Sequence, residues 1–260
     1  MSSLIAMAVF DSKENDRTKY TAETLASLKK TVNLVDHTLY IIDNGSCEAT
    51  KKVIENFVKK IDSVQVITNQ TNIGTAKAIN QAWKFRKEGQ HCIKMDNDVV
   101  IHQEGWVELL EDAISRDPEN IGQVALKRKD IQESPNNPHE FYKSEIFMLP
   151  HVVGQRWIIG EEVQHCIGTC VMHNSKLIDK VGGLEQMNGL YGFDDSLMSL
   201  RSRIAGFKNI FIPSVNIDHI DAGDNPYIQE KQVYAGKMME AYGKAREEYI
   251  NGTKDVYLSL

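Results

Sequence analysis

Asp96 and Asp98 are two carboxylates, separated by Asn97, that directly follow the apolar segment 92–95. Residues two apart at the end of a strand share a face, so both carboxylates can point at one divalent cation. Carboxylate oxygens suit Mg²⁺ and Mn²⁺, which proteins commonly share with substrate phosphates. An ion held there could neutralise a diphosphate as it leaves. The same spacing also occurs in solvated turns, so the pair needs support from other motifs.

A second acidic pair, Asp194 and Asp195, follows Tyr191 and Gly192 and opens a predicted helix over 195–205. Acidic side chains stabilise the first turn of a helix for a purely structural reason. Alternatively, one of the two carboxylates could act as a general base that deprotonates an acceptor hydroxyl. Gly192 would allow the backbone to approach a ligand closely. The residues themselves leave both interpretations open.

Two further features could bind a ligand or serve only the fold. The loop that begins at Asn72 opens a helix, and its backbone N–H groups together with Lys77 could hold an anionic group. Asn72 could equally cap that helix. His219 ends the apolar segment 215–220, where a single histidine is usually structural. It becomes a metal ligand only if the fold brings it to Asp98.

Strand-like and helix-like segments alternate up to about residue 126. Alternation with short connections predicts parallel strands joined by right-handed crossovers. Ligands bind outside the carboxyl ends of such strands, so the polar turns there should lie together. The predicted strands are 4–10, 39–42, 64–67, 92–95 and 121–126, and the predicted helices are 21–30, 48–60, 75–87 and 106–116.

The segment 128–160 breaks this alternation and contains three of the six prolines. It is predicted to form loops and irregular strands that face a ligand. Beyond it, we expect a single domain to continue, because the chain shows no internal repeat or linker. The later predicted helices are 177–181, 195–205 and 227–249, and the later predicted strands are 209–212 and 215–220. The last helix could dock on the domain or mediate a dimer.

The composition is that of a soluble globular protein, with 42% hydrophobic and 25% charged residues among 260. A net charge of −6 argues against a broad nucleic-acid-binding face, although residues 127–129 form a small basic run. The N-terminus lacks the features of a signal peptide. No apolar stretch reaches the ~20 residues that span a bilayer, so membrane contact would be peripheral.

The four cysteines are scattered, which indicates reduced thiols in a cytoplasmic protein. One cluster of thiols and imidazoles could suggest zinc, but its spacing is not that of a zinc finger. A buried strand explains the same segment more simply. The cluster consists of His165, Cys166, Cys170 and His173.

Taken in order, the motifs resemble the family 2 glycosyltransferases with the GT-A fold, over about residues 4–220. The motifs are Ile41–Ser46, Asn72–Ala76, Asp96–Asp98, Gly182–Leu184, Gly192–Asp195 with Arg201, and His219. The resemblance implies an α/β, Rossmann-like mixed sheet, mostly parallel and flanked by helices. It divides residues 1–260 into a nucleotide-sugar-binding half at 1–126, an acceptor and catalytic half at 127–226, and a C-terminal helix and tail at 227–260.

The resemblance also implies a donor site. Asp43 would hydrogen-bond the base, usually uracil, and Asp98 would ligate Mn²⁺ or Mg²⁺ directly. Asp96 would lie near the ribose and the metal, and His219 would complete the metal shell. The full nucleotide set implied is Phe10, Asp11, Asp43, Asn72, Gly74, Lys77, Asp96 and Asn97.

For catalysis, the resemblance implies that Asp195 is the general base of an inverting transfer. Asp194 stands where the family usually has glutamate. The acceptor site is assigned to Tyr191, Gly192 and Trp157, with Trp157 either a stacking platform or a core residue. The Gln-x-x-Arg-Trp motif of processive synthases is absent, which favours addition of a single sugar.

The expected protein is therefore a metal-dependent hexosyl or pentosyl transferase that uses a nucleoside-diphosphate sugar, with UDP as the expected nucleotide. Its acceptor could be a saccharide, a lipid carrier, a protein or a modified nucleobase. We expect it in the cytoplasm, with peripheral membrane contact and homo-oligomers as further options. One alternative is a nucleotidyltransferase of the same fold class. It would need a glycine-rich basic segment after the first strand, which residues 11–16 do not provide. A catalytically silent binding module would not need the acidic set retained here.

Overall fold

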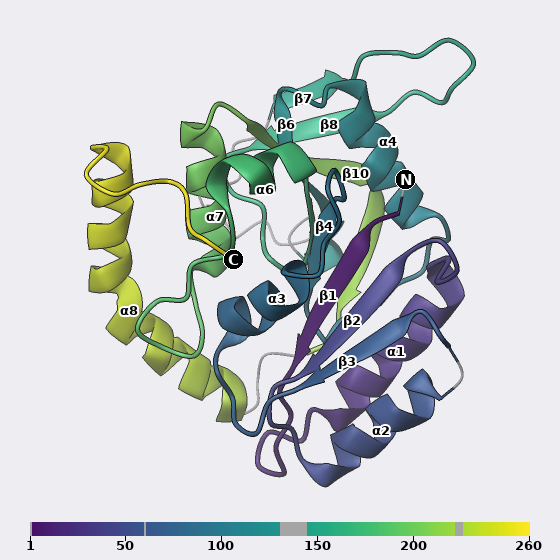
Figure 1. Cartoon of the computed structure of the whole chain (residues 1–260), viewed down its shortest axis with the longest axis vertical. Helices are drawn as coiled ribbons and strands as arrows, with labels where there is room; N and C mark the ends of the chain where they lie inside the picture. The colour runs from purple at the N-terminus through teal and green to yellow at the C-terminus, as the bar shows by residue number, and fades with distance from the viewer. Residues whose placement is uncertain (1, 60, 131–144, 222–225) are drawn as a thin grey trace.

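The computed structural model describes residues 2–59, 61–130, 145–221 and 226–260. Its centre is a ten-stranded mixed sheet in the order β3-β2-β1-β4-β9-β6-β10-β8-β7, with β5 paired to β10 (Figure 1). The strands are β1 Leu4–Val9, β2 Thr38–Asp43, β3 Val64–Thr68, β4 Cys92–Met95, β5 Val99–Ile101, β6 Ile121–Arg128, β7 Glu145–Met148, β8 Ile159–Val163, β9 Cys170–His173 and β10 Lys208–His219. The helices are α1 Thr18–Thr31, α2 Glu48–Val58, α3 Thr75–Trp83, α4 Trp106–Arg116, α6 Ser175–Val181, α7 Asp194–Ile204 and α8 Pro226–Ile250.

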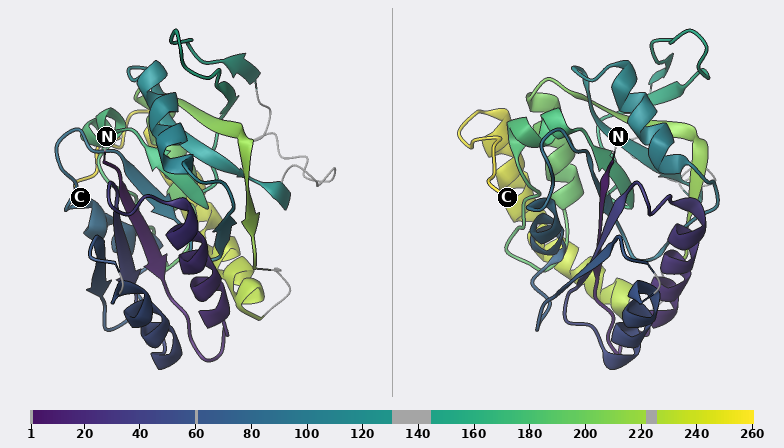
Figure 2. Two further views of the ribbon diagram at one scale, coloured as in Figure 1. Left: turned by 90° about the vertical axis from the view of Figure 1, so that its right-hand side faces the viewer. Right: turned by 45° about the vertical axis from the view of Figure 1, so that its right-hand side comes forward.

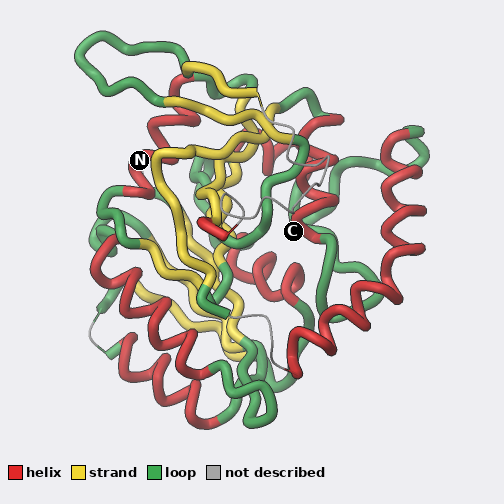
Figure 3. Tube along the Cα trace, turned by 180° about the vertical axis from the view of Figure 1, so that it is seen from behind, coloured by secondary structure: helices red, strands yellow, loops and turns green. Residues whose placement is uncertain are grey.

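The first four strands of the sheet are all parallel, as the alternating sequence predicted. Strand β1 is apolar throughout because both of its faces are covered. Ile5 and Met7 pack into one core cluster with α1, α2 and α4, whereas Leu4 and Ala6 pack into a second cluster with α3 and α6. Figure 3 shows α1 and α2 beside the parallel strands and α8 along the opposite flank.

The second half of the sheet is mixed. Strand β9 runs antiparallel between β4 and β6, and β10 runs parallel to β6. The sequence predicted two strands over 209–220, but β10 is one long strand with a shift in register between Ile212 and Asn216. Pro213 lies in this shift, since proline has no N–H to donate to a neighbouring strand. Beyond the shift, β10 continues to His219, where it pairs with β5.

Only part of the segment 128–160, predicted as loops and irregular strands that face a ligand, is described by the structure. Residues 131–144 lie outside the described part, and 145–160 contains the β7–β8 hairpin at the edge of the sheet. Its loop projects at the top of Figure 1 and in both views of Figure 2, whereas the carboxyl ends of β1 and β2 lie at the bottom. Arg116, at the end of α4, donates hydrogen bonds to the carbonyls of Pro150 and Arg156 in this loop. The loop is thus held against α4, away from those strand ends.

Trp157 lies in that loop. Its side chain is 60% exposed and stacks on the ring of His151, with ring centroids 3.8 Å apart. The core position considered for Trp157 is therefore wrong. The sequence could not show this, because Trp157 stands in a loop between two apolar residues, Leu149 and Ile158. Both are buried and anchor the base of the loop.

The C-terminal helix α8 docks on α7 through an apolar cluster of Leu197, Ala245 and Tyr249. The tail that follows it returns to the domain, where Leu258 forms a parallel bridge with Gly182. Arg201, fully buried on α7, donates hydrogen bonds to three carbonyls, those of Val181, Gly183 and Val256. Within the described residues, no helix is both long and apolar enough to cross a membrane.

Arg201→Lys should lower the free energy of unfolding by about 2–4 kcal/mol, because an ammonium group cannot satisfy three carbonyls placed for a guanidinium. Urea unfolding followed by circular dichroism measures the change. Arg203→Lys, an exposed residue of the same helix, is the matched control. Equal stability of the two variants would contradict the role assigned to Arg201.

Candidate active site

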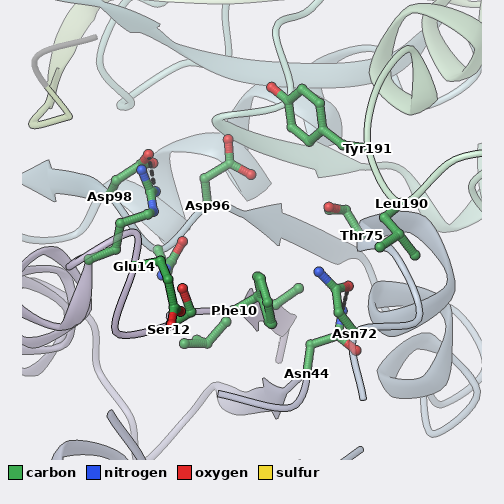
Figure 4. Close-up of a pocket in the computed structure, with 14 residues that line it drawn as sticks. Phe10, Ser12, Glu14, Asn44, Asn72, Thr75, Asp96, Asp98, Leu190 and Tyr191 are labelled. Atoms are coloured by element: carbon green, nitrogen blue, oxygen red, sulfur yellow. Dashed lines mark hydrogen bonds and ion pairs between the residues drawn. The ribbon is translucent and has the colours of Figure 1, made fainter. Parts of the chain in front are cut away.

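A cavity of about 450 Å³ opens at the carboxyl ends of β1, β2 and β4 (Figure 4). The strand order places the loops after these three strands side by side, as the parallel topology requires. The cavity is lined by Ala8, Val9, Phe10, Ser12, Glu14, Arg17, Asn44, Asn72, Thr75, Asp96, Asn97, Asp98, Leu190 and Tyr191. Six of these were predicted from the sequence for the site: Phe10, Asn72, Asp96, Asn97, Asp98 and Tyr191.

The end of β10 brings His219 to Asp98. His219 pairs with Val99 of β5, and the N–H of Ile220 donates to the carbonyl of Asp98. As a result, Nε2 of His219 lies 3.4 Å from Oδ2 of Asp98. The condition on which the sequence made His219 a candidate metal ligand is therefore met.

Arg17 binds the same carboxylate. Its Nη2 lies 2.6 Å from Oδ2 of Asp98, and its Nη1 pairs with Asp221. All three side chains are almost completely buried. Burial raises the pKa of Asp98, but the hydrogen bond and charge of His219, together with Arg17, hold it well below its ordinary value. Asp98 is therefore an anion at neutral pH.

The second oxygen of Asp98, Oδ1, is buried without a hydrogen-bond partner in the described part of the chain. A buried carboxylate oxygen left in this way is unusual and fits a missing ligand such as a cation. Asp98 and His219 thus provide two donors for a divalent ion. They do not form a complete cage, because no group of three histidine, cysteine or acidic side chains is arranged for a metal within the described ranges. The remaining ligands would have to come from substrate or water.

Asp96 is directed elsewhere. Its carboxylate is about one-third exposed in the cavity, and Oδ1 lies 3.5 Å from Nζ of Lys94. The two carboxylates of the motif therefore have different neighbours.

Asn97, the middle residue of the motif, anchors the strand ends to each other. Its side-chain N–H group donates to Oδ1 of Asp11, 3.0 Å away, and to the hydroxyl of Thr21. Asp11 is fully buried and also accepts hydrogen bonds from Thr21 and Thr50. Burial raises the pKa of Asp11, even though these hydrogen bonds and the charge of Arg17 lower it. Asp11 thus fixes the loops around the cavity and does not line it.

The turn after β2 separates Asp43 from Asn44. Oδ1 of Asp43 accepts the N–H of Ser46, and its side chain faces a different depression beside α2 and β3. Asn44 lines the cavity and donates to Oδ1 of Asn72 at 2.8 Å. The structure therefore brings Asn44 and Asn72, but not Asp43, to the cavity wall.

Helix α3 is preceded by Gly74, its N-cap residue, which has a φ of +93° that favours glycine. Oδ1 of Asn72 accepts the N–H of Gly74, but it does not cap the N–H groups of the first turn, a role that the sequence allowed. Instead, Oε1 of Gln186 accepts from the N–H groups of Ala76 and Lys77. The side chain of Lys77 lies outside the cavity lining. This capping holds the loop of Gln186 over the start of α3.

A buried lysine connects the cavity to the second acidic pair. Nζ of Lys94 lies 3.4 Å from Oδ2 of Asp194 and donates to the carbonyl of Gly168 at 3.0 Å. Burial lowers the pKa of Lys94, but the charges of Asp194 and Asp96 raise it well above its ordinary value. Lys94 is thus a permanent cation between the two acidic motifs.

Asp195 is held by backbone and side-chain groups. Its Oδ2 accepts the N–H of Gly168 at 2.9 Å, and its Oδ1 accepts the N–H of Ser196 at 2.8 Å. Asp194, in contrast, is almost fully buried, and burial raises its pKa against the lowering charge of Lys94. The neighbouring carboxylates therefore differ, with Asp195 the more accessible of the two.

The turn before this pair has unusual backbone geometry. Phe193 has a φ of +62°, a conformation that a bulky residue rarely adopts, and its ring stacks on Tyr242 of α8 at 4.4 Å. Gly192 before it has a φ of +113°. Strain of this kind is often found at functional sites. Tyr191 lies in the cavity wall, but Trp157 is not part of the lining.

Sequence reasoning missed Arg17, Asn44, Lys94 and Gln186. Asn44 could have been found, since it belongs to the same turn as Asp43. Arg17 and Gln186 have no local signal, because each acts on residues more than 80 positions away. Lys94 in a buried strand was a signal in itself, since lysine is rarely buried without a partner.

The sequence model of the family Glycosyl transferase family 2 matches residues 8–182, well over half of the chain. This chain belongs to glycosyl transferase family 2. Its mixed α/β sheet has the GT-A fold. No curated protein sequence matches it.

Several solved structures share the fold. The mannosyltransferase PcManGT from Pyrobaculum calidifontis, in complex with GDP-Man and Mn²⁺, has a TM-score of 0.59 at 14% identity, covering 84% of this chain and 56% of that one. GalNAc-T7 with UDP, GalNAc and Mn²⁺ has a TM-score of 0.61 at 15% identity, covering 84% and 44%. S. aureus TarS 1–349 with UDP-GlcNAc has a TM-score of 0.58 at 15% identity, covering 85% and 61%. The chain thus spans about half the length of these neighbours.

Arg17→Met should lower the free energy of unfolding by about 3–5 kcal/mol, because it removes the guanidinium from two buried carboxylates. Adding Asp98→Asn to this variant should recover part of the loss, since it removes one of the two buried negative charges that have lost the guanidinium. Chemical denaturation of the single and double variants provides the measurement. Lys19→Met, an exposed cation near the start of the same helix, is the control. A loss no larger than that of the control would show that the ion pairs contribute little.

Proposed function

We propose that this glycosyltransferase moves one sugar from a UDP-linked donor to an acceptor hydroxyl, with inversion at the anomeric carbon. The observation that carries the proposal is the buried, unpartnered Oδ1 of Asp98, a residue whose Oδ2 faces His219 and which lines a cavity large enough for a nucleotide. A carboxylate and an imidazole in this arrangement suit a divalent cation shared with phosphate oxygens.

Asp98 and His219 would hold Mn²⁺ or Mg²⁺, and Asp96 would face the donor from the wall of the same cavity. When bound, the ion supplies Lewis-acid stabilisation of the diphosphate leaving group. Two of the structural neighbours contain Mn²⁺ together with a nucleotide or nucleotide sugar, which supports this assignment. Arg17 keeps Asp98 ionised and oriented from the other side of the carboxylate.

The donor nucleotide would lie along the loops after β1, β2 and β4. Phe10, Asn44 and Asn72 wall the cavity, and Asp11 and Asn97 hold its loops in place. Asp43 lies outside the cavity lining. It would act on the nucleotide base only indirectly, by holding the turn that it shares with Asn44. UDP is the preferred nucleotide because it, or a UDP-sugar, accompanies two of the neighbours.

Asp195 would be the general base. The acceptor hydroxyl gives its proton to Asp195 as its oxygen forms a bond to the anomeric carbon. The bond between that carbon and the diphosphate oxygen breaks on the opposite side, and UDP leaves. Lys94 and the N–H of Gly168 fix the position of the acidic pair relative to the donor cavity. Tyr191 and Gly192 would contact the acceptor, which could be a saccharide, a lipid carrier, a protein or a modified nucleobase.

UDP with Mn²⁺ should raise the melting temperature, and EDTA should remove the shift. A ligand that binds only the native state stabilises it by about 2.7 kcal/mol at a hundredfold excess over Kd. Asp98→Ala should abolish the shift, whereas Asp62→Ala, an exposed carboxylate, should keep it. Differential scanning fluorimetry with a panel of nucleoside diphosphates makes the measurement. If no nucleotide produces a shift in the wild type with Mn²⁺, the donor site is wrongly assigned.

Asp195→Asn should reduce sugar transfer by about 10²–10⁴-fold, because the amide cannot accept the proton. UDP binding should be unchanged, since Asp195 lies outside the donor cavity. Release of UDP from UDP-sugars in the presence of candidate acceptors measures the rate. Asp62→Asn serves as the control for the loss of a carboxylate. A rate for Asp195→Asn within threefold of wild type would rule out its role as the base.

A further inference from the structure

His165 lies in the loop between β8 and β9 and faces the proposed base. Its Nε2 is 3.4 Å from Oδ2 of Asp195 and 3.4 Å from the hydroxyl oxygen of Ser196. The side chains of His165 and Asp195 are only 19% and 23% exposed, so their interaction is weakly screened by solvent. The sequence pointed to His165 only as part of a possible zinc cluster.

We propose that His165 and Asp195 form a proton-sharing pair, in which His165 is a positioning residue that sets the pH at which Asp195 can accept the acceptor's proton. The inference rests on the proposed function, because it concerns the same general base. It assigns His165 no direct contact with substrate.

The geometry allows Asp195 little freedom. One oxygen is shared between the N–H of Gly168 and the ring of His165, and the other accepts the N–H of Ser196. These contacts hold the carboxylate in a single orientation. A carboxylate held in one orientation cannot turn away from the imidazole beside it. The protonation state of His165 therefore directly affects the basicity of Asp195.

The charged and titratable groups around the pair come from three elements and one loop. Asp195 and Asp194 belong to α7, Lys94 to β4 and Tyr242 to α8, and His165 itself belongs to the β8–β9 loop. Burial lowers the pKa of His165, but the charge and hydrogen bond of Asp195 raise it above its ordinary value. Burial raises the pKa of Asp195, but the charge and hydrogen bond of His165 and the charge of Lys94 hold it well below its ordinary value.

These opposite shifts have a consequence for the rate. While His165 carries a proton, Asp195 is stabilised as an anion and is a poor base. Once His165 has lost that proton, Asp195 can take the proton of the acceptor hydroxyl as the new carbon–oxygen bond forms and UDP departs. The proton then passes to solvent. Turnover should therefore rise with pH through the raised pKa of His165.

The pH dependence of turnover in wild type and His165→Gln tests this relation. Wild-type kcat should increase from about pH 6 to about pH 8. In His165→Gln, the ratio of kcat at pH 8 to kcat at pH 6 should be lower than in wild type by about threefold or more. His151→Gln, on the exposed β7–β8 loop, should retain the wild-type profile. An unchanged profile in His165→Gln overturns the inference and leaves the proposed function intact.

A second readout does not need turnover. The His165 imidazole can be titrated by NMR in wild type and in Asp195→Asn, and its pKa should be lower in the variant because the facing charge is gone. An equal pKa in both proteins overturns the pairing. If the paired titration is found but no UDP-sugar is turned over, the proposed function fails while the pair itself stands.

Discussion

The contact between Arg17 and Asp98 is the interaction on which the site depends. It joins the start of α1 to the loop after β4, and the same guanidinium holds Asp221 beyond β10. Three segments distant in sequence are thereby fixed around one buried charge. Burying two carboxylates without a partner would be costly in free energy, so the guanidinium compensates both charges at the wall of the cavity.

Lys94 has the corresponding role between the cavity and the acidic pair on α7. It lies in a strand with a covered face on each side, and its ammonium group reaches Asp96, Asp194 and the carbonyl of Gly168. Moving the acidic pair relative to the cavity would therefore break a buried ion pair. The two halves of the site are held in register by charge as well as by the β4–β9 pairing.

Much of the fold was predictable. The parallel strands β1 to β4 and their helices follow from hydrophobic runs and turn residues, because local patterning decides which faces are buried. The predictions were poorer where partners are distant. Strand β10 was expected as two strands, since the bend at Pro213 resembles a break. The regular β7–β8 hairpin at the sheet edge was not predicted, because a change in composition does not show where in the sheet a segment pairs.

The sequence by itself determined the family, the strand ends that carry Asp96 and Asp98, and the helix that begins at the acidic pair. Each depends on residues within a few positions of one another. Only the tertiary structure decided that His219 and Arg17 meet at Asp98, that Asn44 faces the cavity in place of Asp43, and that His165 faces Asp195. These contacts join residues far apart in the chain, so their existence depends on strand order and register, which local periodicity does not encode.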